Sequence, residues 1–411
     1  MMQLITLFQA QNWHITFASP SKLGEHRTDL LTLGVNEQSI ELNNTSFDHF
    51  ILQLQPQVVI FDRFMMEEQF GWRVEKHAPN ATRVLNTEDL HSLRTVRQTI
   101  VKDYLKTAPN NIDLTDMPLH DAQHLLTNMA QTDLAKREVA AIFRCDLTLM
   151  ISEFEMDLLQ NQFQVPSQQL CYLPFLYSSE LCQTHANHSY ETRQHFIAIG
   201  NFRHEPNWDA VLWLKQDLWP KIRQQLPSTE LHIYGAYPPK KATQLHNEKQ
   251  GFHVLGWAED AFEVIRQARV CLAPLRFGAG IKGKLAESML CGTPSVTTSM
   301  GTESMRMPTE KNQFADWAGE EANNTEDFVQ AAVHLYNHKD HWLKAQQTGF
   351  ETVQSRYLTP QATQVDFIMQ LDHIMKHLDK HKQHNFIGAM LNHHHHKSTQ
   401  YMAQWIEAKN Q

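Results

Sequence analysis

Short apolar runs alternate with longer amphipathic stretches along most of this chain, and that alternation restricts the fold more than any other feature of the sequence. Each run has the length of a buried strand, and the stretches between runs have the apolar spacing of helices. Strands that alternate with helices form parallel sheets covered by crossover helices. The predicted strands are His14–Ser19, Val58–Asp62, Arg83–Leu85, Leu147–Ile151, Phe196–Ile199, Leu231–Tyr234, Val270–Ala273 and Ser295–Thr298.

The predicted strands fall into two groups, which indicates an α/β protein with two Rossmann-like, doubly wound domains facing a cleft. Residues 1–178 form the N-terminal domain and residues 194–355 the C-terminal domain, with a polar linker at residues 179–193. The strand signal then stops, and residues 356–411 predict a helical tail whose apolar stripe must dock on the rest of the molecule. The stripe consists of Phe367, Leu371 and Met375, followed later by Met402 and Ile406.

The N-terminus departs from the usual start of such a domain. Residues 1–11 predict an amphipathic helix, whereas a doubly wound domain begins with a strand and a tight loop. We therefore expect that first strand to be absent and the strands near 14–19 and 58–62 to lack a pairing partner. We also expect the helix to be poorly supported, and a chain extended upstream by a strand and a loop to be more soluble and more active. The helix's apolar face is formed by Leu4, Leu7 and Phe8.

Charge and cysteine usage narrow the function classes. Lys and Arg total 36 against 45 Asp and Glu, a net charge of −9, which argues against binding to nucleic acid. No apolar run approaches the length of about 18 residues, so we expect no transmembrane segment, and peripheral membrane contact stays open. The 5 cysteines are odd in number and have no CxxC spacing, so we expect them to be reduced in a cytoplasmic protein.

A glycine loop followed by a helix is the most informative local motif. The strand at Val270–Ala273 leads into Gly278 and Gly280, and a helix is predicted from Lys282 to Leu290. Gly292 has the place of a left-handed residue that ends this helix. A glycine loop at a helix N-terminus presents free N–H groups and a positive dipole end to an anion.

Helical spacing then sorts the side chains of this segment. Lys284 and Glu287 share one face with Gly280, while Ile281 lies on the buried face. With Lys282, this places two cations beside the glycine loop and a carboxylate one turn further on. A diphosphate at the loop would place its ribose near Glu287. The alternative is an ordinary surface ion pair between Lys284 and Glu287.

A second motif follows the strand at Phe196–Ile199. The strand ends at Gly200, and Arg203 lies in the loop before a helix that Pro206 opens. Open α/β sheets bind ligands at the carboxyl ends of their strands, and an arginine there forms charge-assisted bonds to phosphate. The alternative for Arg203 is an exposed loop residue.

Together these motifs resemble the donor domain of GT-B glycosyltransferases. The order is G-x-F-x-x-x-P-N-W-D, a strand L-x-I-x-G, G-W, A-P-L-x-x-G-x-G-I-K-x-K-x-x-E, G-T-P-x-V-T-T and G-T-E, over about residues 195–305. Among GT-B enzymes, the motifs resemble those of the large retaining family 4, also called glycosyl transferases group 1. That family includes bacterial polysaccharide and lipopolysaccharide sugar transferases. The N-terminal half resembles the family more loosely, at residues 87–94 and 137–155.

The resemblance implies a retaining glycosyltransferase that uses a nucleotide-diphospho-sugar and needs neither metal nor another cofactor. The acceptor would be a cell-surface glycan or a lipid-linked precursor. The leaving diphosphate would be neutralised by the three cations Arg203, Lys282 and Lys284. His91, after the strand at residues 83–85, would face the acceptor, or else cap or pack its helix.

The same resemblance assigns the binding groups. Gly200, Gly278, Gly280 and Ile281 would line the sugar and diphosphate, and Glu287 would accept the ribose hydroxyls. Gly256 and Trp257 would contact the base, and Glu303 the sugar.

The chain departs from the family pattern at Ala279, where many members have the first carboxylate of an E-x7-E motif. A catalytically impaired nucleotide-sugar-binding protein, left after loss of the first strand, is one alternative. A sugar-nucleotide epimerase, which needs several cleft carboxylates, is another. The tail histidines, among them His373, His377 and His393, are interpreted as surface residues, and no metal site is expected.

Overall fold

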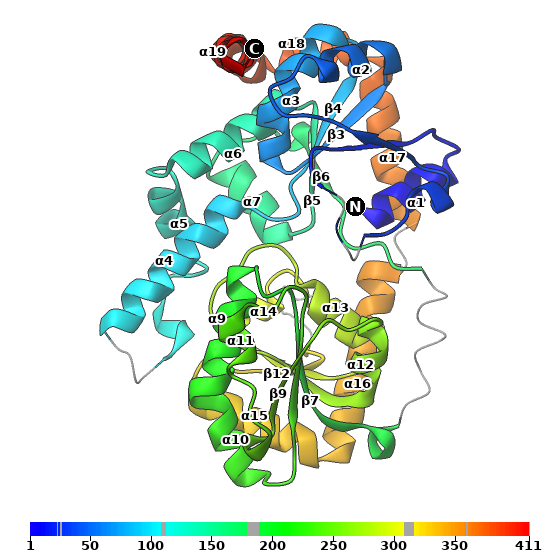
Figure 1. The fold of residues 1–411 in the computed structure, drawn as a ribbon. Coiled ribbons are helices and arrows are strands. Elements are labelled where there is room, and N and C mark those ends of the chain that lie inside the picture. Colours follow the sequence, from blue (N-terminus) through cyan, green and yellow to red (C-terminus); the bar gives the residue numbers. More distant parts are fainter. Residues whose placement is uncertain are drawn as a thin grey trace.

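The computed structural model describes residues 1–22, 24, 27–107, 112–178, 189–307, 316–358 and 361–410. It consists of two halves, each built around a parallel sheet, with a helical C-terminal region (Figure 1). The predicted doubly wound α/β fold is therefore confirmed.

The C-terminal half holds a six-stranded sheet in the order β12-β11-β10-β7-β8-β9, parallel throughout. Helices cover both faces, with α9 and α10 on one side and α12, α13 and α16 on the other (Figure 1). Its strands are β7 (Gln194–Ile199), β8 (Leu231–Tyr234), β9 (Phe252–Gly256), β10 (Ala268–Ala273), β11 (Ser295–Thr297) and β12 (Gly319–Glu321). Its helices are α9 (Glu205–Trp213), α10 (Trp219–Gln225), α11 (Lys240–Thr243), α12 (Ala261–Gln267), α13 (Gly283–Leu290), α14 (Ser299–Thr302), α15 (Thr325–Asn337) and α16 (Lys339–Val353).

The N-terminal half holds a four-stranded parallel sheet in the order β3-β4-β5-β6. Its strands are β1 (Thr16–Ser19), β2 (Asn36–Ser39), β3 (Val58–Asp62), β4 (Thr82–Asn86), β5 (Leu147–Met150) and β6 (Leu170–Tyr172). Its helices are α1 (Met2–Ala10), α2 (Ser46–Leu54), α3 (Phe64–His77), α4 (His91–Thr107), α5 (Ala122–Met129), α6 (Asp133–Arg144) and α7 (Glu153–Asn161).

The first strands of this half stand apart from its main sheet. Within the described residues, β1 and β2 pair only with each other, and β3 pairs only with β4. β3 therefore has a neighbour on one side only, as predicted, whereas β1 has a partner in β2, contrary to the prediction. The prediction that α1 is poorly supported is wrong, because Leu4, Leu7 and Phe8 are buried against the sheet and the C-terminal region.

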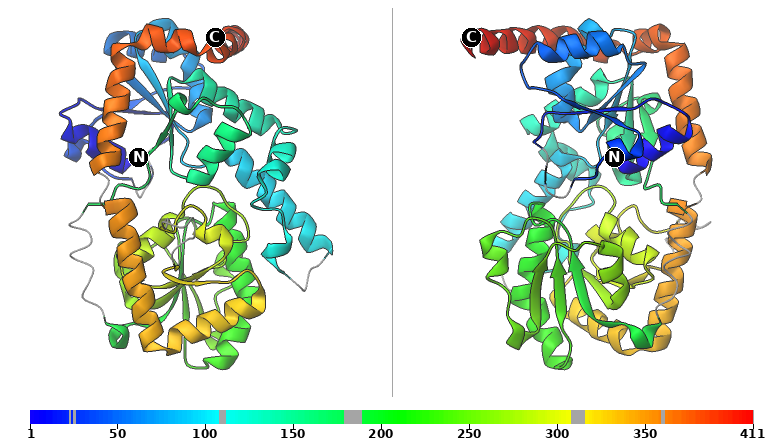
Figure 2. Two further views of the ribbon diagram at one scale, coloured as in Figure 1. Left: turned by 180° about the vertical axis from the view of Figure 1, so that it is seen from behind. Right: turned by 45° about the vertical axis from the view of Figure 1, so that its right-hand side comes forward.

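The C-terminal region returns to the N-terminal half as α17 (Gln361–Lys376), α18 (Leu378–His384) and α19 (Phe386–Asn410) (Figure 2). Phe367 and Leu371 of α17 are fully buried in the cluster that contains α1, so the predicted stripe docks there. On α19 the stripe was placed wrongly, because Met402 is 62% exposed and the neighbouring Ala403 is buried. A helix of alternating apolar and polar residues leaves the buried face ambiguous in the sequence.

An excursion from the N-terminal half packs on the C-terminal half. The second part of α4 and the segment after it place Val101 and Leu119 in the hydrophobic core of the six-stranded sheet. The backbone N–H of Leu114 donates to the carbonyl of Asn323 at 2.9 Å. The two halves are thus joined by buried contacts as well as by the chain, and α4 spans them (Figure 1).

Two further predictions concern the whole chain. None of the described helices has the length and apolar character needed to cross a lipid bilayer. Cys145, Cys171, Cys271 and Cys291 are buried and free, while Cys182 and residues 179–188 of the predicted linker lie outside the described residues.

Candidate active site

A cleft of about 560 Å³ lies between the two halves, beyond the carboxyl ends of strands from both sheets. Ligands of open α/β sheets bind at such edges. From the N-terminal half the cleft is lined by Glu88, Asp89, His91 and Arg94, and from the C-terminal half by Gly200, Asn207, Gly278, Ile281, Lys282, Lys284 and Glu287. Most of the residues that the sequence singled out therefore face one space.

The two sequence motifs meet at Lys284. Its Nζ donates to Oδ1 of Asn207 at 2.6 Å, and Asn207 belongs to the second motif, at the start of α9. Gly200 allows this approach, because a Cβ there would lie 2.5 Å from the Asn207 amide and 3.0 Å from Lys284 Nζ. Burial lowers the pKa of Lys284 to about 8. The ammonium is thus fixed in the cleft with little water around it, as a site for an anion requires.

Glu287 follows Lys284 by one turn on α13 and lines the same cleft. Burial raises the pKa of its carboxyl group, an effect that the nearby Lys284 ammonium opposes. No hydrogen bond to this carboxylate is present among the described residues. Two acceptor oxygens therefore remain for hydroxyl groups of a ligand, as predicted for a ribose.

The glycine loop is partly occupied by the opposite half. The N–H of Gly280 donates to Oε1 of Glu155 at 2.6 Å, so this group is not free for an anion as the sequence suggested. Burial raises the pKa of Glu155 to about 8. Gly280 has φ of 63°, and a Cβ there would lie 3.0 Å from Asp89, so only glycine fits between the halves. Glu155 thus supplies this loop with a carboxyl group, which Ala279 lacks.

Lys282 caps the start of α13 and lines the cleft, but its ammonium is turned onto the loop. Its Nζ donates to the carbonyl of Gly280 at 2.6 Å. Burial lowers its pKa, and the carboxylate of Glu303 opposes that effect. Lys282 therefore stabilises the loop in this state, while Lys284 faces the open space.

Glu303 is held away from the cleft. Its two oxygens accept hydrogen bonds from both terminal nitrogens of Arg97 on α4, at 2.8 and 2.6 Å, and one lies 2.7 Å from Nδ1 of His120. The Arg97 guanidinium and His120 hold the pKa of this buried carboxyl well below its usual range, against the effect of burial. The structure thus places Glu303 in a contact between the halves, and the predicted sugar contact stays a prediction.

Arg203 lines a second hollow of about 550 Å³. The Arg203 guanidinium stacks 4.0 Å from the ring centre of Tyr237, and neither residue lines the cleft. Gly256, with φ of 78°, adjoins this hollow, because a Cβ there would lie 3.7 Å from Pro238. Trp257 follows it and is 48% exposed. The roles predicted for Arg203, Gly256 and Trp257 remain predictions.

His91 starts a helix and also borders the cleft, and its predicted role toward an acceptor stays a prediction. It begins α4, where its N–H donates to Oε1 of the buried Glu138 at 2.8 Å, and its ring also lines the cleft. Its Nε2 lies 3.5 Å from a carboxylate oxygen of Asp89. Burial lowers the pKa of His91, which Asp89 opposes.

Three charged residues next to His91 were not predicted from the sequence as site residues. Arg94 forms an ion pair with Asp89, and both line the cleft. Glu88 also lines it, with a backbone φ of 60° that is rare outside glycine, and burial raises its pKa. Strained backbone conformations of this kind are enriched at functional sites. The sequence feature that could have identified these residues is their position, because residues 87–94 directly follow the carboxyl end of β4.

Comparisons with known proteins agree with this arrangement. The sequence profile of the family described as glycosyl transferases group 1 matches residues 193–338. No curated protein sequence matches the chain.

Among solved structures, sucrose-phosphate synthase from Thermosynechococcus elongatus is similar with a TM-score of 0.61 at 14% identity, over 90% of this chain and 91% of that one. HepE from Anabaena, in complex with UDP and glucose, has a TM-score of 0.59 at 11% identity, over 90% and 95%. TarM from S. aureus, in a complex that includes UDP, has a TM-score of 0.54 at 12% identity over 79% of this chain, which spans only 58% of TarM.

The chain therefore has the GT-B fold of glycosyltransferases, and its C-terminal half carries a glycosyl transferases group 1 domain.

Proposed function

We propose that this protein transfers a sugar from a nucleotide-diphospho-sugar to a glycan or lipid-linked acceptor, with retention of configuration and without a bound metal. One observation carries the proposal. Lys284 and Glu287 lie one turn apart on α13 and face the interdomain cleft, where Lys284 also meets Gly200 and Asn207 of the second motif. A cation and an unoccupied carboxylate at this spacing fit a diphosphate followed by a ribose.

The charges of the cleft suggest how the reaction is assisted. Negative charge grows on the diphosphate as the bond to the sugar breaks, and a fixed cation stabilises it best where water is excluded. Lys284 and the N-terminus of α13 provide that positive potential. Lys282 adds to it once its bond to the Gly280 carbonyl is exchanged for one to phosphate. We propose that these groups replace a metal at the leaving diphosphate.

The opposite wall offers an acceptor site. His91, Asp89 and Arg94 project from the start of α4 and the loop before it. The proposal places the acceptor here, with the sugar between these residues and Gly278. The base extends toward Gly256 and Trp257, at the carboxyl end of β9. The complexes of HepE and TarM, which contain UDP, support UDP as the first nucleotide to test.

A nucleotide-sugar-binding protein with impaired catalysis is the second candidate, and one observation favours it. The carboxylate of Glu155 occupies the N–H of Gly280, and Ala279 provides no carboxylate of its own. A protein in which this contact persists would hold the nucleotide without completing transfer.

Product analysis separates these functions. The chain is incubated with labelled UDP-sugars, and with GDP-sugars and ADP-sugars, together with glycan and lipid-linked acceptors. We expect label on an acceptor, with the anomeric configuration of the donor by NMR and no dependence on added Mg²⁺ or Mn²⁺. Binding without turnover would support the impaired protein, and an isomerised donor would identify an epimerase. Lys284→Met should abolish transfer, while Lys221→Met, at an exposed residue of α10 outside the cleft, serves as the matched control.

A further inference from the structure

Three histidines and a glutamate gather at the end of the six-stranded sheet that lies opposite the cleft. His195, His232 and His253 are each the second residue of their strand, in the neighbouring parallel strands β7, β8 and β9. Glu230 directly precedes β8. The cleft borders Gly200, at the other end of β7. The cluster is thus separate from the proposed chemistry.

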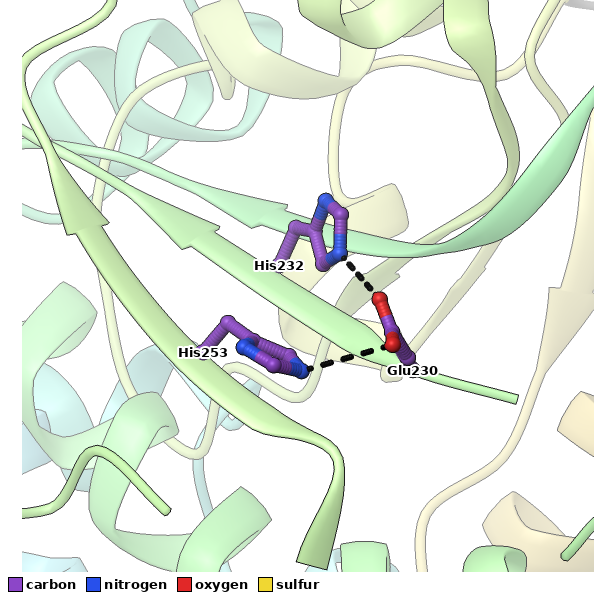
Figure 3. Close-up of side chains that lie close together, drawn as sticks. All are labelled: Glu230, His232 and His253. Atoms are coloured by element: carbon purple, nitrogen blue, oxygen red, sulfur yellow. Dashed lines mark hydrogen bonds and ion pairs between the residues drawn. The ribbon is translucent and has the colours of Figure 1, made fainter. Parts of the chain in front are cut away.

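Strand register brings two of the imidazoles side by side. His232 and His253 are partners across β8 and β9, and partners in a parallel ladder project from the same face. Glu230 precedes His232 by two residues, so the period of a strand directs it to that face as well. Figure 3 shows the Glu230 carboxylate between the two rings.

The distances match a tetrahedral metal site. Oε2 of Glu230 lies 2.9 Å from Nε2 of His232, and Oε1 lies 3.7 Å from Nε2 of His253 (Figure 3). The three ligand atoms all lie within 4.8 Å of one another. Zinc bonds of about 2.0–2.2 Å in a tetrahedron place neighbouring ligand atoms roughly 3.3 Å apart. The observed separations bracket that value.

One of these ligand atoms lacks a hydrogen bond. Nε2 of His253 is buried and accepts or donates none among the described residues. Buried polar atoms in folded proteins nearly always have a partner, and one without it often marks an ion or a water molecule. This nitrogen is directed at the same carboxylate as Nε2 of His232 (Figure 3).

Neighbouring rings fix the orientation of both ligands. The ring of His195 stacks on His232, with centroids 3.9 Å apart, and the ring of His246 meets His253 edge-on at 5.5 Å. Nδ1 of His246 accepts the N–H of Val254, which holds that ring in place. Side-chain exposures of 19% for His232, 17% for His253 and 49% for Glu230 leave an entry path and space for a water as fourth ligand.

We propose that Glu230, His232 and His253 bind a divalent transition-metal ion, with Zn²⁺ as the best fit. Two imidazoles and one carboxylate suit zinc, whereas Mg²⁺ and Ca²⁺ prefer oxygen ligands throughout. The ion joins β9 to β8 at their amino ends. β9 is the edge strand of its sheet and has a register shift against β8, so it lacks the support of a second neighbour. The metal would stabilise the strand that leads to Gly256 and Trp257.

No metal site was expected from the sequence, where the only candidate ligands were the tail histidines. Residues 230, 232 and 253 form a site only through strand register. A second cluster, Glu320, His334 and His341, offers a similar set of ligands at β12, α15 and α16. None of its three ligand atoms is a buried atom without a hydrogen bond among the described residues. This second cluster therefore provides the matched control.

Cobalt(II) substitution tests the proposal on the full chain. Histidines 393–396 are first replaced by alanine so that the tail does not bind the probe, and Co²⁺ is added to the chelator-treated protein. We expect one equivalent with the intense visible bands of a four-coordinate ion, displaced by Zn²⁺. His253→Gln should weaken Co²⁺ binding by at least about 100-fold, and His232→Gln likewise. His341→Gln should leave the spectrum and the affinity unchanged.

Circular dichroism and UDP binding control for misfolding in each variant. A second readout is thermal unfolding, where Zn²⁺ should raise the melting temperature of the parent and of His341→Gln but not of His253→Gln. The proposal is overturned if the parent takes up no stoichiometric metal, if its spectrum is that of a six-coordinate ion, or if His341→Gln loses the metal while His253→Gln retains it. Because UDP binding is measured separately, these outcomes do not depend on the proposed transferase function.

Discussion

Removing the Arg97 side chain should release the two halves of the molecule from one another. Arg97 is fully buried on α4 and donates two hydrogen bonds to Glu303 and one each to the carbonyls of Leu119 and Gly278. In Arg97→Met the Glu303 charge remains buried without its bidentate partner, next to His120 and the Lys282 ammonium. Breaking a buried pair in this way costs about 3–5 kcal/mol.

The assay is urea denaturation followed by tryptophan fluorescence, at pH 7.5 and with a double-mutant cycle. Glu303→Gln in the Arg97→Met background removes the buried charge and should recover a large part of the loss. Arg137→Met is the matched control, because Arg137 forms an ion pair with Glu68 in which the arginine side chain is 54% exposed and the glutamate side chain 12% exposed. A pair of this kind contributes about 0–1 kcal/mol. If Arg97→Met were no more destabilising than Arg137→Met, the buried contact between the halves would be refuted.

Three further predictions concern the cleft and its supports. The ammonium of Lys284 is charged below its pKa of about 8 and neutral above it, so affinity for UDP should fall as pH rises through 8. Lys284→Arg should retain affinity to higher pH, and a flat profile in the parent would contradict the role of this cation. Gly292→Ala should lower the free energy of unfolding by roughly 1–3 kcal/mol, because φ is 62° and a Cβ would lie 2.5 Å from Phe350; an unchanged melting temperature would argue against this. Arg203→Ala should reduce kcat less than Lys284→Ala does, because the Arg203 guanidinium stacks on Tyr237 outside the cleft. Equal losses of kcat in the two variants would indicate that Arg203 also contacts the diphosphate.

The fold could be predicted where strands are apolar and buried. Val58–Asp62 and Leu231–Tyr234 have the predicted bounds, because a short apolar run between polar loops has few alternatives to a strand. The four strands β2, β6, β9 and β12 were missed, each of them at the edge of its sheet, and the residues of β2 and β12 are also polar. Edge strands such as these form by pairing with a neighbour, and their own side chains carry little signal.

The candidate site could likewise be predicted where it depends on local sequence patterns, and not where it depends on contacts between the two halves. Lys284 and Glu287 were placed correctly in the cleft because helix periodicity alone fixes their relation. The contacts of Glu155 with Gly280, across 125 residues, and of Arg97 with Glu303, across 206, were not predicted. They depend on how two separately folded halves meet, which no local pattern encodes. Gly292 was recognised as the left-handed residue after α13, since a helix end is a local feature.

Calorimetric titration of UDP onto the parent chain and onto Glu287→Gln tests the central claim most directly. Glu287 is predicted to accept ribose hydroxyls, and a hydrogen bond to a charged group contributes about 1.5–3 kcal/mol. The account predicts one binding site in the parent and an affinity lower by roughly 10–100-fold in Glu287→Gln. Glu351→Gln, an exposed carboxylate on α16, should bind as the parent does. Equal affinity in the parent and in Glu287→Gln would contradict the account, because the cleft would then not hold a nucleotide in the proposed position.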